Sequence, residues 1–221
     1  MNAEIIEKIS PNTSMDAIEA TRAQSWKALH AIAKSIEPGM TEKAAIHQAN
    51  QHFASLGVKK FWHKSHVRFG KNTIYSFDDP YLDDGYRLQD NDIFFLDLGP
   101  IFNGIEGDVG ASFVVGNDPI MQTCVRDVKV LFDQVREHWS ATQTSGAALC
   151  DFARQAAKKL GWLYSPDYVK GHRLSEFPHS FHFKGTLADV DFHPKPKVWV
   201  LEVQIRHPEL PIGAFYEDLL V

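Results

Sequence analysis

The sequence of 221 residues contains only two cysteines, Cys124 and Cys150. Both fall in stretches of helical periodicity beside apolar neighbours, which favours small buried side chains over a disulfide or a thiol nucleophile. This low cysteine content argues against a disulfide framework of the kind found in small secreted domains. It fits a reducing compartment, and we expect a cytoplasmic protein.

The chain also lacks long apolar runs and clusters of like charge. No window approaches the roughly 20 apolar residues of a membrane span, and the first ten residues lack the apolar core of a signal peptide. Lys and Arg total 23 against 28 Asp and Glu, a net charge of −5 with the histidines neutral. Nucleic acids and anionic membranes both attract basic faces. We therefore expect neither a nucleic-acid partner nor a membrane partner.

What remains is the composition of an ordinary globular domain, with 44% apolar and 23% charged residues. No linker or low-complexity stretch divides the chain, so residues 1–221 are expected to form one catalytic domain. Periodicity predicts two helices followed by strands up to residue 115, and then two helices followed by strands again. This repeated order indicates a structural duplication, although the halves share no visible sequence identity.

Capping signals place the starts of the predicted helices. Thr13 followed by Asp16 has the pattern of a capping box for the first helix, which Pro38 would end. The second helix is expected to start near Thr41, and Asp118 with the proline after it opens the third.

The first candidate site lies in a predicted hairpin. An Asn-Gly pair at residues 103 and 104, flanked by apolar residues, is the strongest short-range signal for a two-residue turn. Counting outward from it places Gly110 opposite Asp97 and Gly99 opposite Asp108. Because side chains alternate along a strand, Asp97 and Asp108 become diagonal neighbours on one face. Two such carboxylates repel each other in apolar surroundings unless a cation compensates them; solvent-facing aspartates on an edge hairpin are the alternative.

Two later strands add further carboxylates. The strand expected over residues 198–205 is apolar on both faces except for Glu202 and Gln204, and Glu217 lies in a last strand near residue 221. A single glutamate in such a strand is more often ion-paired than a metal ligand. Four carboxylates on two buried hairpins are harder to explain in that way.

Histidines complete the candidate set. His172, His179 and His182 lie in the irregular segment 171–185, and each taken singly indicates no more than a surface or hydrogen-bonded imidazole. One imidazole together with four carboxylates makes an oxygen-rich set. Such a set is typical of two divalent ions such as Mn, Fe or Co and differs from the cysteine-rich sets of structural zinc.

The order Asp97, Asp108, His172, Glu202 and Glu217 resembles the ligand set of the pita-bread metallopeptidases, which include methionine aminopeptidase, Xaa-Pro aminopeptidase, prolidase and creatinase. The resemblance covers nearly the whole chain. It implies an α+β, pseudo-symmetric fold with a curved antiparallel sheet and helices on its outer face. It also implies two divalent ions (Mn, Co, Fe or Zn), with Asp97 on one, Asp108 and Glu217 bridging, and His172 and Glu202 on the other.

The chemistry implied by this resemblance is hydrolysis of a peptide or related amide bond, most like that of an Xaa-Pro aminopeptidase or dipeptidase. A metal-bridged water would attack a carbonyl carbon, Glu202 would shuttle the proton, and His179 would contact the substrate and the tetrahedral intermediate. The expected partner is a peptide or small amide substrate. The oligomeric state stays open, with a homodimer among the options. Two alternatives remain: a peptide- or protein-binding module with little activity, and a hydrolase of a small non-peptide amide.

Some positions depart from the family pattern. Phe77 stands where most members have a histidine, Val203 replaces a usual proline, and there is no room for a large N-terminal domain, so a stand-alone catalytic domain is expected. Because phenylalanine donates no hydrogen bond, we expect weak or absent activity on ordinary aminopeptidase substrates. Either His63 or His66 replaces the missing group, or both are surface histidines. Five aromatic residues are candidates for a substrate pocket or for the core: Phe61, Trp62, Phe69, Tyr75 and Tyr81.

Overall fold

The computed structural model describes residues 2–75, 85–165 and 170–221. Its helices are α1 (Ala3–Ile6), α2 (Met15–Ala33), α3 (Glu42–Ser55), α4 (Pro119–Ala141) and α5 (Gly146–Lys159). Its strands are β1 (His66–Phe69), β2 (Asp92–Leu98), β3 (Ile101–Phe102), β4 (Ile105–Glu106), β5 (Val109–Val115), β6 (Leu163–Tyr164), β7 (Val200–Arg206) and β8 (Gly213–Leu219). Short 3₁₀ turns cover Gly70–Ile74, His179–Phe181 and Leu187–Asp189.

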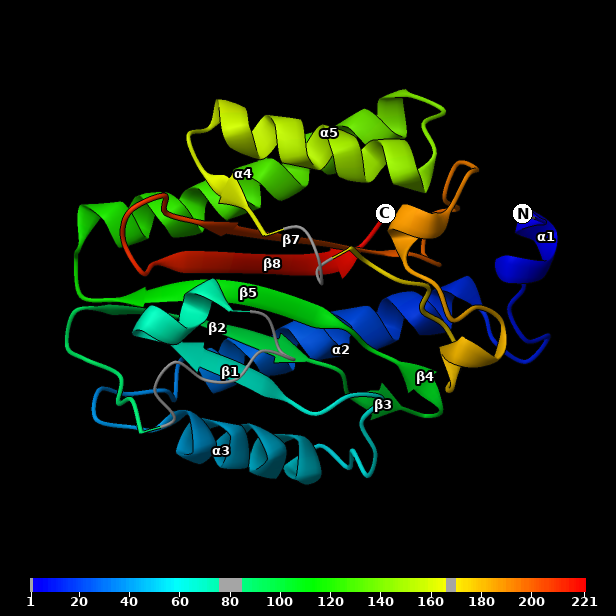
Figure 1. Ribbon diagram of the computed structural model, residues 1–221. Helices are drawn as coiled ribbons and strands as arrows, with labels where there is room; N and C mark the ends of the chain where they lie inside the picture. The colour runs from blue at the N-terminus through cyan, green and yellow to red at the C-terminus, as the bar shows by residue number, and fades with distance from the viewer. Residues whose placement is uncertain (1, 76–84, 166–169) are drawn as a thin grey trace.

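Six of these strands form one antiparallel sheet in the order β1-β2-β5-β8-β7-β6. The first three strands come from the first half of the chain and the last three from the second half, in reversed order. The two halves therefore meet between β5 and β8, as Figure 1 shows. This mirrored arrangement confirms the expected pseudo-symmetric α+β fold with its antiparallel sheet.

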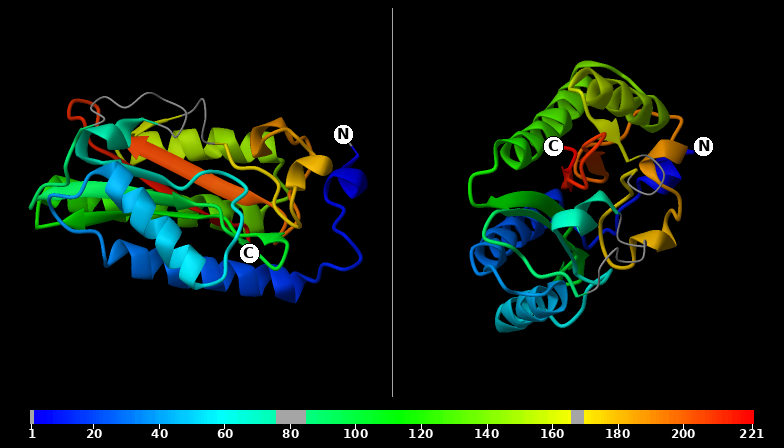
Figure 2. Two further views of the ribbon diagram at one scale, coloured as in Figure 1. Left: turned by 90° about the horizontal axis from the view of Figure 1, so that it is seen from below. Right: turned by 60° about the vertical axis from the view of Figure 1, so that its left-hand side comes forward.

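The four long helices lie on the outer face of the sheet (Figure 2), and the short turn Leu187–Asp189 in the second half of the chain packs against α5. One core cluster packs the strands of the second half against α4 and α5, with Trp199 and Phe132 among its largest side chains. A second cluster packs α2 and α3 against the first-half strands around Phe53 and Phe69. Each helix pair thus buries its own apolar face, as the repeated sequence pattern predicts.

Most helix starts agree with the capping signals, and one does not. The side chains of Thr41 and Asp118 accept hydrogen bonds from the first turns of α3 and α4, as predicted. The cap of α2 is Ser14, whose hydroxyl accepts from the Ala17 N–H, so the prediction of a box at Thr13 was wrong by one residue. Serine caps helices somewhat better than threonine, and the sequence offers both in succession.

The hairpin prediction is confirmed in its register. Asn103 and Gly104 have φ angles of 52° and 81°, the left-handed values that a type I′ turn requires at both central positions. Asp97 lies opposite Gly110, as the count from the turn predicts. The short strands β3 and β4 beside the turn continue the same register.

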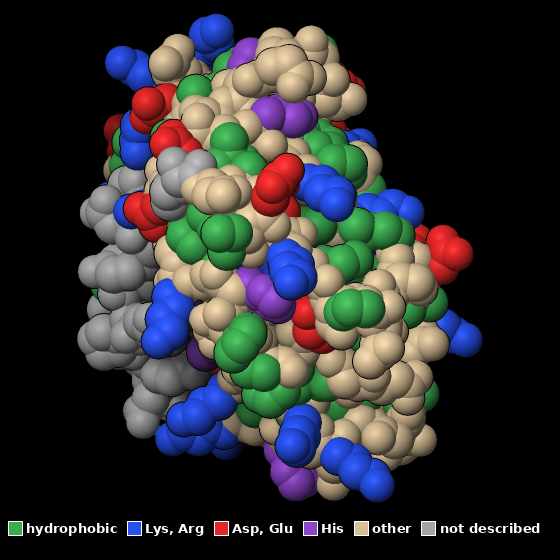
Figure 3. All heavy atoms as spheres, turned by 90° about the vertical axis from the view of Figure 1, so that its right-hand side faces the viewer, with side chains coloured by type: hydrophobic (Ala, Val, Ile, Leu, Met, Phe, Trp, Pro, Cys, Tyr) green, Lys and Arg blue, Asp and Glu red, His purple; other side chains and the backbone are tan. Residues whose placement is uncertain are grey.

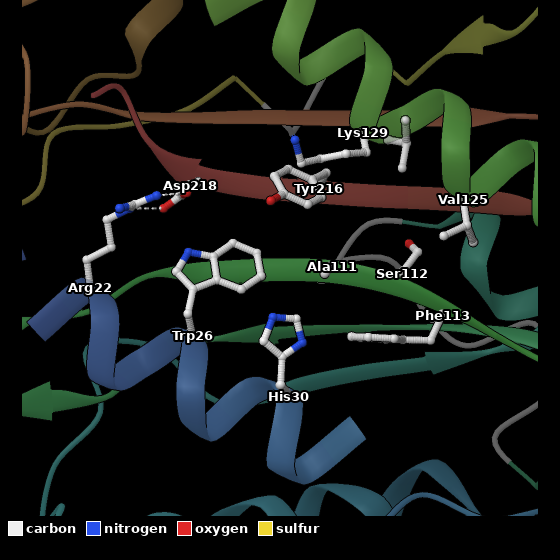
Figure 4. A pocket seen from close by; sticks show the side chains of 11 residues that line it. Arg22, Trp26, His30, Ala111, Ser112, Phe113, Val125, Lys129, Tyr216 and Asp218 are labelled. Carbon is white, nitrogen blue, oxygen red and sulfur yellow. Dashed lines mark hydrogen bonds and ion pairs between the residues drawn. The ribbon is translucent and has the colours of Figure 1, made fainter. Parts of the chain in front are cut away.

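The outer face carries a cleft between α2 and α4, seen from close by in Figure 4. Trp26 from α2 stacks on Tyr216 from β8, with ring centroids 5.5 Å apart. Arg22 reaches from α2 to the buried Asp218. Because Asp218 follows Glu217 in β8, the two side chains point to opposite faces of the sheet. The cleft therefore lies behind the strand that carries Glu217.

The surface shows mixed charge. On the face drawn in Figure 3, Lys and Arg side chains are spread among acidic and hydrophobic ones. This agrees with the lack of like-charge runs in the sequence. Within the described residues, no helix is both long and apolar enough to cross a membrane.

Candidate metal centre

Three of the carboxylates lie in one row across the sheet. The ladder places Asp97 of β2 opposite Gly110 of β5, and Gly110 opposite Glu217 of β8. Glu217 in turn lies directly opposite Glu202 of β7. Residues directly opposite each other in a sheet project to the same face. The row therefore gathers three buried carboxylates from two hairpins that are more than 80 residues apart in the chain.

Asp108 and His172 complete the cluster. Asp108 immediately precedes β5. His172 follows β6 in the chain and forms an isolated antiparallel β-bridge with Thr186. The Nε2 atom of His172 lies 2.7 Å from Oδ2 of Asp108, 3.5 Å from Oε1 of Glu202 and 3.9 Å from Oε1 of Glu217. The structure thus brings all five predicted ligand residues into one place.

A cavity of about 500 Å³ lies above this cluster. Trp62 covers one side of it, with its ring centroid 4.7 Å from that of His172 and 5.0 Å from that of His179. An apolar wall of this kind limits the access of solvent and strengthens the electrostatic interactions inside. The remaining wall carries Lys64, Lys170 and Lys184.

Burial governs the ionisation of the carboxylates in the row. It raises the pKa of Asp97 and of Glu202 to about 7, although His63 and His172 lower these pKa values in part and neighbouring carboxylates raise them again. Burial and the nearby charges of Asp108 and Asp97 raise the pKa of Glu217 well above its usual value. In the absence of a bound cation, the cluster therefore takes up protons.

Asp108 behaves differently because two imidazoles contact it. Burial opposes its ionisation, but hydrogen bonds with His172 and His63 outweigh burial and hold its pKa well below the usual range. Conversely, the Asp108 carboxylate overcomes the effect of burial on His172 and raises the pKa of that imidazole to about 9. For His63 too, burial lowers the pKa, but the charge of Asp97 and the contact with Asp108 outweigh it and raise the pKa to about 9. Two protonated imidazoles then supply the positive charge that the carboxylates need.

His179 is held by a glutamate that the sequence analysis did not single out. The backbone N–H of His179 donates to Oε1 of Glu106 over 3.0 Å, and Nδ1 lies 2.7 Å from Oε2. Glu106 is buried, so this carboxylate fixes the imidazole in one orientation at the edge of the cavity. The only sequence signal for it was the single acidic residue between Asp97 and Asp108, on the short strand after the turn.

These donors suit divalent cations. Asp108, His172 and Glu217 offer atoms that all lie within 4.8 Å of one another, and so do His63, His66 and Asp97. Carboxylate oxygens combined with imidazole nitrogens match the preferences of Mn, Fe, Co and Zn. Metal ions would compensate the carboxylates in place of protons. The residues present therefore fit a two-metal centre.

The other predicted residues fall in different places. His182 bonds to Glu176 and lies outside the cavity wall. Phe61 and Phe69 pack in the first-half core, so for them the alternative of core packing is correct. Phe77 and Tyr81 lie outside the described residues. Val203 is fully buried in β7, beside Glu202.

Comparison with known proteins shows which family the chain belongs to. The model of metallopeptidase family M24 matches residues 16–218. The chain belongs to this family. This match confirms the family resemblance that the order of the five ligand residues indicated. No curated protein matches the sequence closely enough to count as a relative.

Solved structures of M24 peptidases share the fold at low sequence identity. An X-Pro aminopeptidase from Thermotoga maritima superposes with a TM-score of 0.72 at 16% identity, over 93% of this chain and 60% of that chain. A prolidase from Pyrococcus horikoshii gives 0.72 at 16% identity, over 95% and 59%. A methionine aminopeptidase from Thermotoga maritima gives 0.69 at 16% identity, over 100% and 97%. This M24 chain thus spans about 60% of the first two chains and nearly all of the third.

Proposed function

We propose that this M24 chain is a dimetal hydrolase that cleaves a peptide or related amide bond, in the manner of an Xaa-Pro aminopeptidase or dipeptidase. One observation carries the proposal: four buried carboxylates and His172 converge beneath a single cavity. A peptide-binding module would not require mutually repelling carboxylates in its floor, since each costs free energy to bury.

In the proposed mechanism, two divalent ions (Mn, Co, Fe or Zn) would be held by Asp97, Asp108, His172, Glu202 and Glu217. When bound, these ions would polarise a carbonyl group and activate a water molecule. Glu202 would accept and return the proton, which suits its position on the wall of the cavity.

His179 serves as the second polar group of the proposed site. Because Glu106 contacts its Nδ1 atom, its Nε2 atom is the one left to face the substrate. With Nδ1–H donated to Glu106, Nε2 carries an N–H for the oxyanion at the scissile carbonyl when the ring holds protons on both nitrogens, a form whose positive charge the Glu106 carboxylate compensates. Trp62 excludes water beside it.

The lysines favour a short substrate. Lys64, Lys170 and Lys184 line the same cavity as the acidic floor, so positive charge surrounds the space that a substrate would fill. A free C-terminal carboxylate close to the scissile bond would suit this wall. We therefore include dipeptides in the proposed substrate class. Both cysteines are free, which agrees with the proposed cytoplasmic location.

The test combines metal analysis with a substrate panel. Purified protein is loaded with Mn, Co, Fe or Zn, and turnover is measured on Xaa-Pro and Xaa-Ala dipeptides, on their C-terminal amides and on longer peptides. We expect two ions per chain and preferential cleavage of dipeptides with a free carboxylate. Tight peptide binding without turnover at full metal loading would instead support a binding module. Glu202→Gln should abolish turnover while the fold is kept.

A further inference from the structure

His63 repeats the arrangement of His172 on the other side of Asp108. In His172, Nδ1 donates to the carbonyl of Arg173 over 2.8 Å and Nε2 lies 2.7 Å from Oδ2 of Asp108. In His63, Nδ1 donates to the carbonyl of Lys64 over 2.7 Å and Nε2 lies 3.3 Å from Oδ1 of the same aspartate. A backbone carbonyl that holds Nδ1–H leaves Nε2 available as a ligand, which is the usual arrangement of metal-binding histidines.

His63 also reaches the carboxylate that His172 does not hold. Its Nε2 atom lies 3.3 Å from Oδ1 of Asp97, whereas the Nε2 atom of His172 is turned toward Glu202. One imidazole therefore stands at each end of the cluster. Both flank Asp108, which is the expected bridging residue.

The backbone around His63 is fixed in this position. The N–H of Trp62 donates to the carbonyl of Gly99, and Phe61 forms a bridge with Pro100, so the segment is tied to the turn that follows β2. Gly99 also supplies the necessary space. A Cβ atom at this position would lie 2.2 Å from Cδ2 of His63 and 2.5 Å from Nε1 of Trp62. The chain thus keeps room for both rings directly beside Asp97.

We propose that Nε2 of His63 is an additional metal ligand, on the ion that Asp97 holds, so that each of the two ions is bound by one imidazole. The inference rests on the proposed dimetal function and adds a ligand to the set implied by the family resemblance. His66 stacks behind His63 with ring centroids 5.5 Å apart. We assign the role to His63 because its Nε2 atom contacts both aspartates. An added imidazole favours Zn, Co or Fe over Mn at that ion.

The test counts imidazole ligands in the cobalt-loaded protein. A histidine bound through Nε2 keeps its Nδ1–H, and paramagnetic Co(II) shifts this solvent-exchangeable proton far outside the normal ¹H NMR range. Wild type should show two such signals. His63→Ala and the larger His63→Gln should each remove one, and His172→Ala should remove the other. His182→Ala is the matched control, because its side chain is 16% exposed like that of His63 and bonds a carboxylate away from the cavity.

Titration calorimetry with Zn provides a second measurement. We expect His63→Ala to weaken one of two binding events by at least about 10-fold. Two unchanged binding events and an unchanged second NMR signal in both His63 variants would overturn the role of His63 and leave the dimetal proposal intact. Failure of the wild type to bind Co or Zn would instead overturn the dimetal proposal, and with it the inference.

Discussion

Arg22 holds Asp218 through two parallel hydrogen bonds, 2.7 Å from Nε to Oδ1 and 2.6 Å from Nη2 to Oδ2. Bidentate geometry of this kind gives the strongest arginine–carboxylate contacts. Asp218 is 4% exposed and directly follows Glu217. The pair therefore ties α2 to the part of β8 that delivers a proposed metal ligand to the opposite face of the sheet.

We expect Arg22→Ala to destabilise the protein by about 3 kcal/mol, because it leaves a buried carboxylate without its partner. Arg154→Ala is the matched control. Its pair with Asp151 is 53% and 68% exposed, so its loss should change the free energy of unfolding by less than about 1 kcal/mol. Urea unfolding of the three proteins measures both values. Equal stabilities for the two variants would show that the Arg22–Asp218 contact contributes little.

The second prediction concerns the bridging role of Asp108. Asp108→Asn removes the charge that both imidazoles face, so we expect occupancy of both ions to fall together. Asp151→Asn, on the exposed face of α5, should leave occupancy unchanged. Metal content after dialysis at limiting metal concentration distinguishes the cases. Loss of only one ion would contradict a bridging Asp108.

The third prediction follows from the pKa shifts in the metal-free protein. Burial raises the pKa of Asp97 and Glu202 to about 7, and contacts with Asp108 and Asp97 raise those of His172 and His63 to about 9. Burial lowers the pKa of His66 to about 4, which opposes only one of these groups, so the folded state still binds more protons than the unfolded chain between about pH 4 and 9. Its stability must fall as the pH rises through this window.

Thermal unfolding of metal-stripped protein from pH 5 to pH 9 measures this dependence. We expect Tm to decrease steadily, and the increase in Tm on adding metal to become larger at higher pH, because metal binding displaces these protons. The metal-loaded protein is the control in each buffer. A metal-free Tm that rises over this range would show that the cluster is not protonated as described.

The sequence was sufficient to predict features that depend on local rules. The Asn-Gly turn determines its own register, and Asp97 accordingly lies opposite Gly110. Capping residues such as Thr41 and Asp118 act within one helical turn, so their roles were visible in the sequence. The repeated element order reflects the two helix-covered half-sheets of the fold.

Features that depend on contacts between distant segments could not be predicted from these local rules. Nothing local indicates that β8 pairs with β5 and so places Glu217 in line with Asp97; only the family resemblance implied that they meet. The sequence offered His63 only as one of two candidates to replace the histidine missing at Phe77, and not as a metal ligand, because the tie between Trp62 and Gly99 that positions it links separate segments. Glu106 was overlooked, since its partner His179 lies 73 residues away.

The last prediction concerns this Glu106–His179 pair. The backbone N–H of His179 donates to Oε1 of Glu106, and Nδ1–H donates to Oε2. In Glu106→Gln one of these oxygens becomes an NH₂ group, which cannot accept. The imidazole must then turn, or give up Nδ1–H and accept from the amide, and in either case it loses the carboxylate charge that stabilises a ring protonated on both nitrogens.

We expect Glu106→Gln to lower kcat by about 10²–10⁴, the usual contribution of a positioned acid or donor, with metal content unchanged. Glu106→Asp keeps the charge and should restore part of the activity. The chain provides a matched control in Glu176, which bonds to Nε2 of His182 over 3.0 Å outside the cavity, so Glu176→Gln should leave kcat within about twofold of wild type. Steady-state kinetics and metal analysis of wild type and the three variants measure kcat and metal content side by side. If Glu106→Gln lost metal in proportion to activity, Glu106 would support the metal centre rather than orient His179.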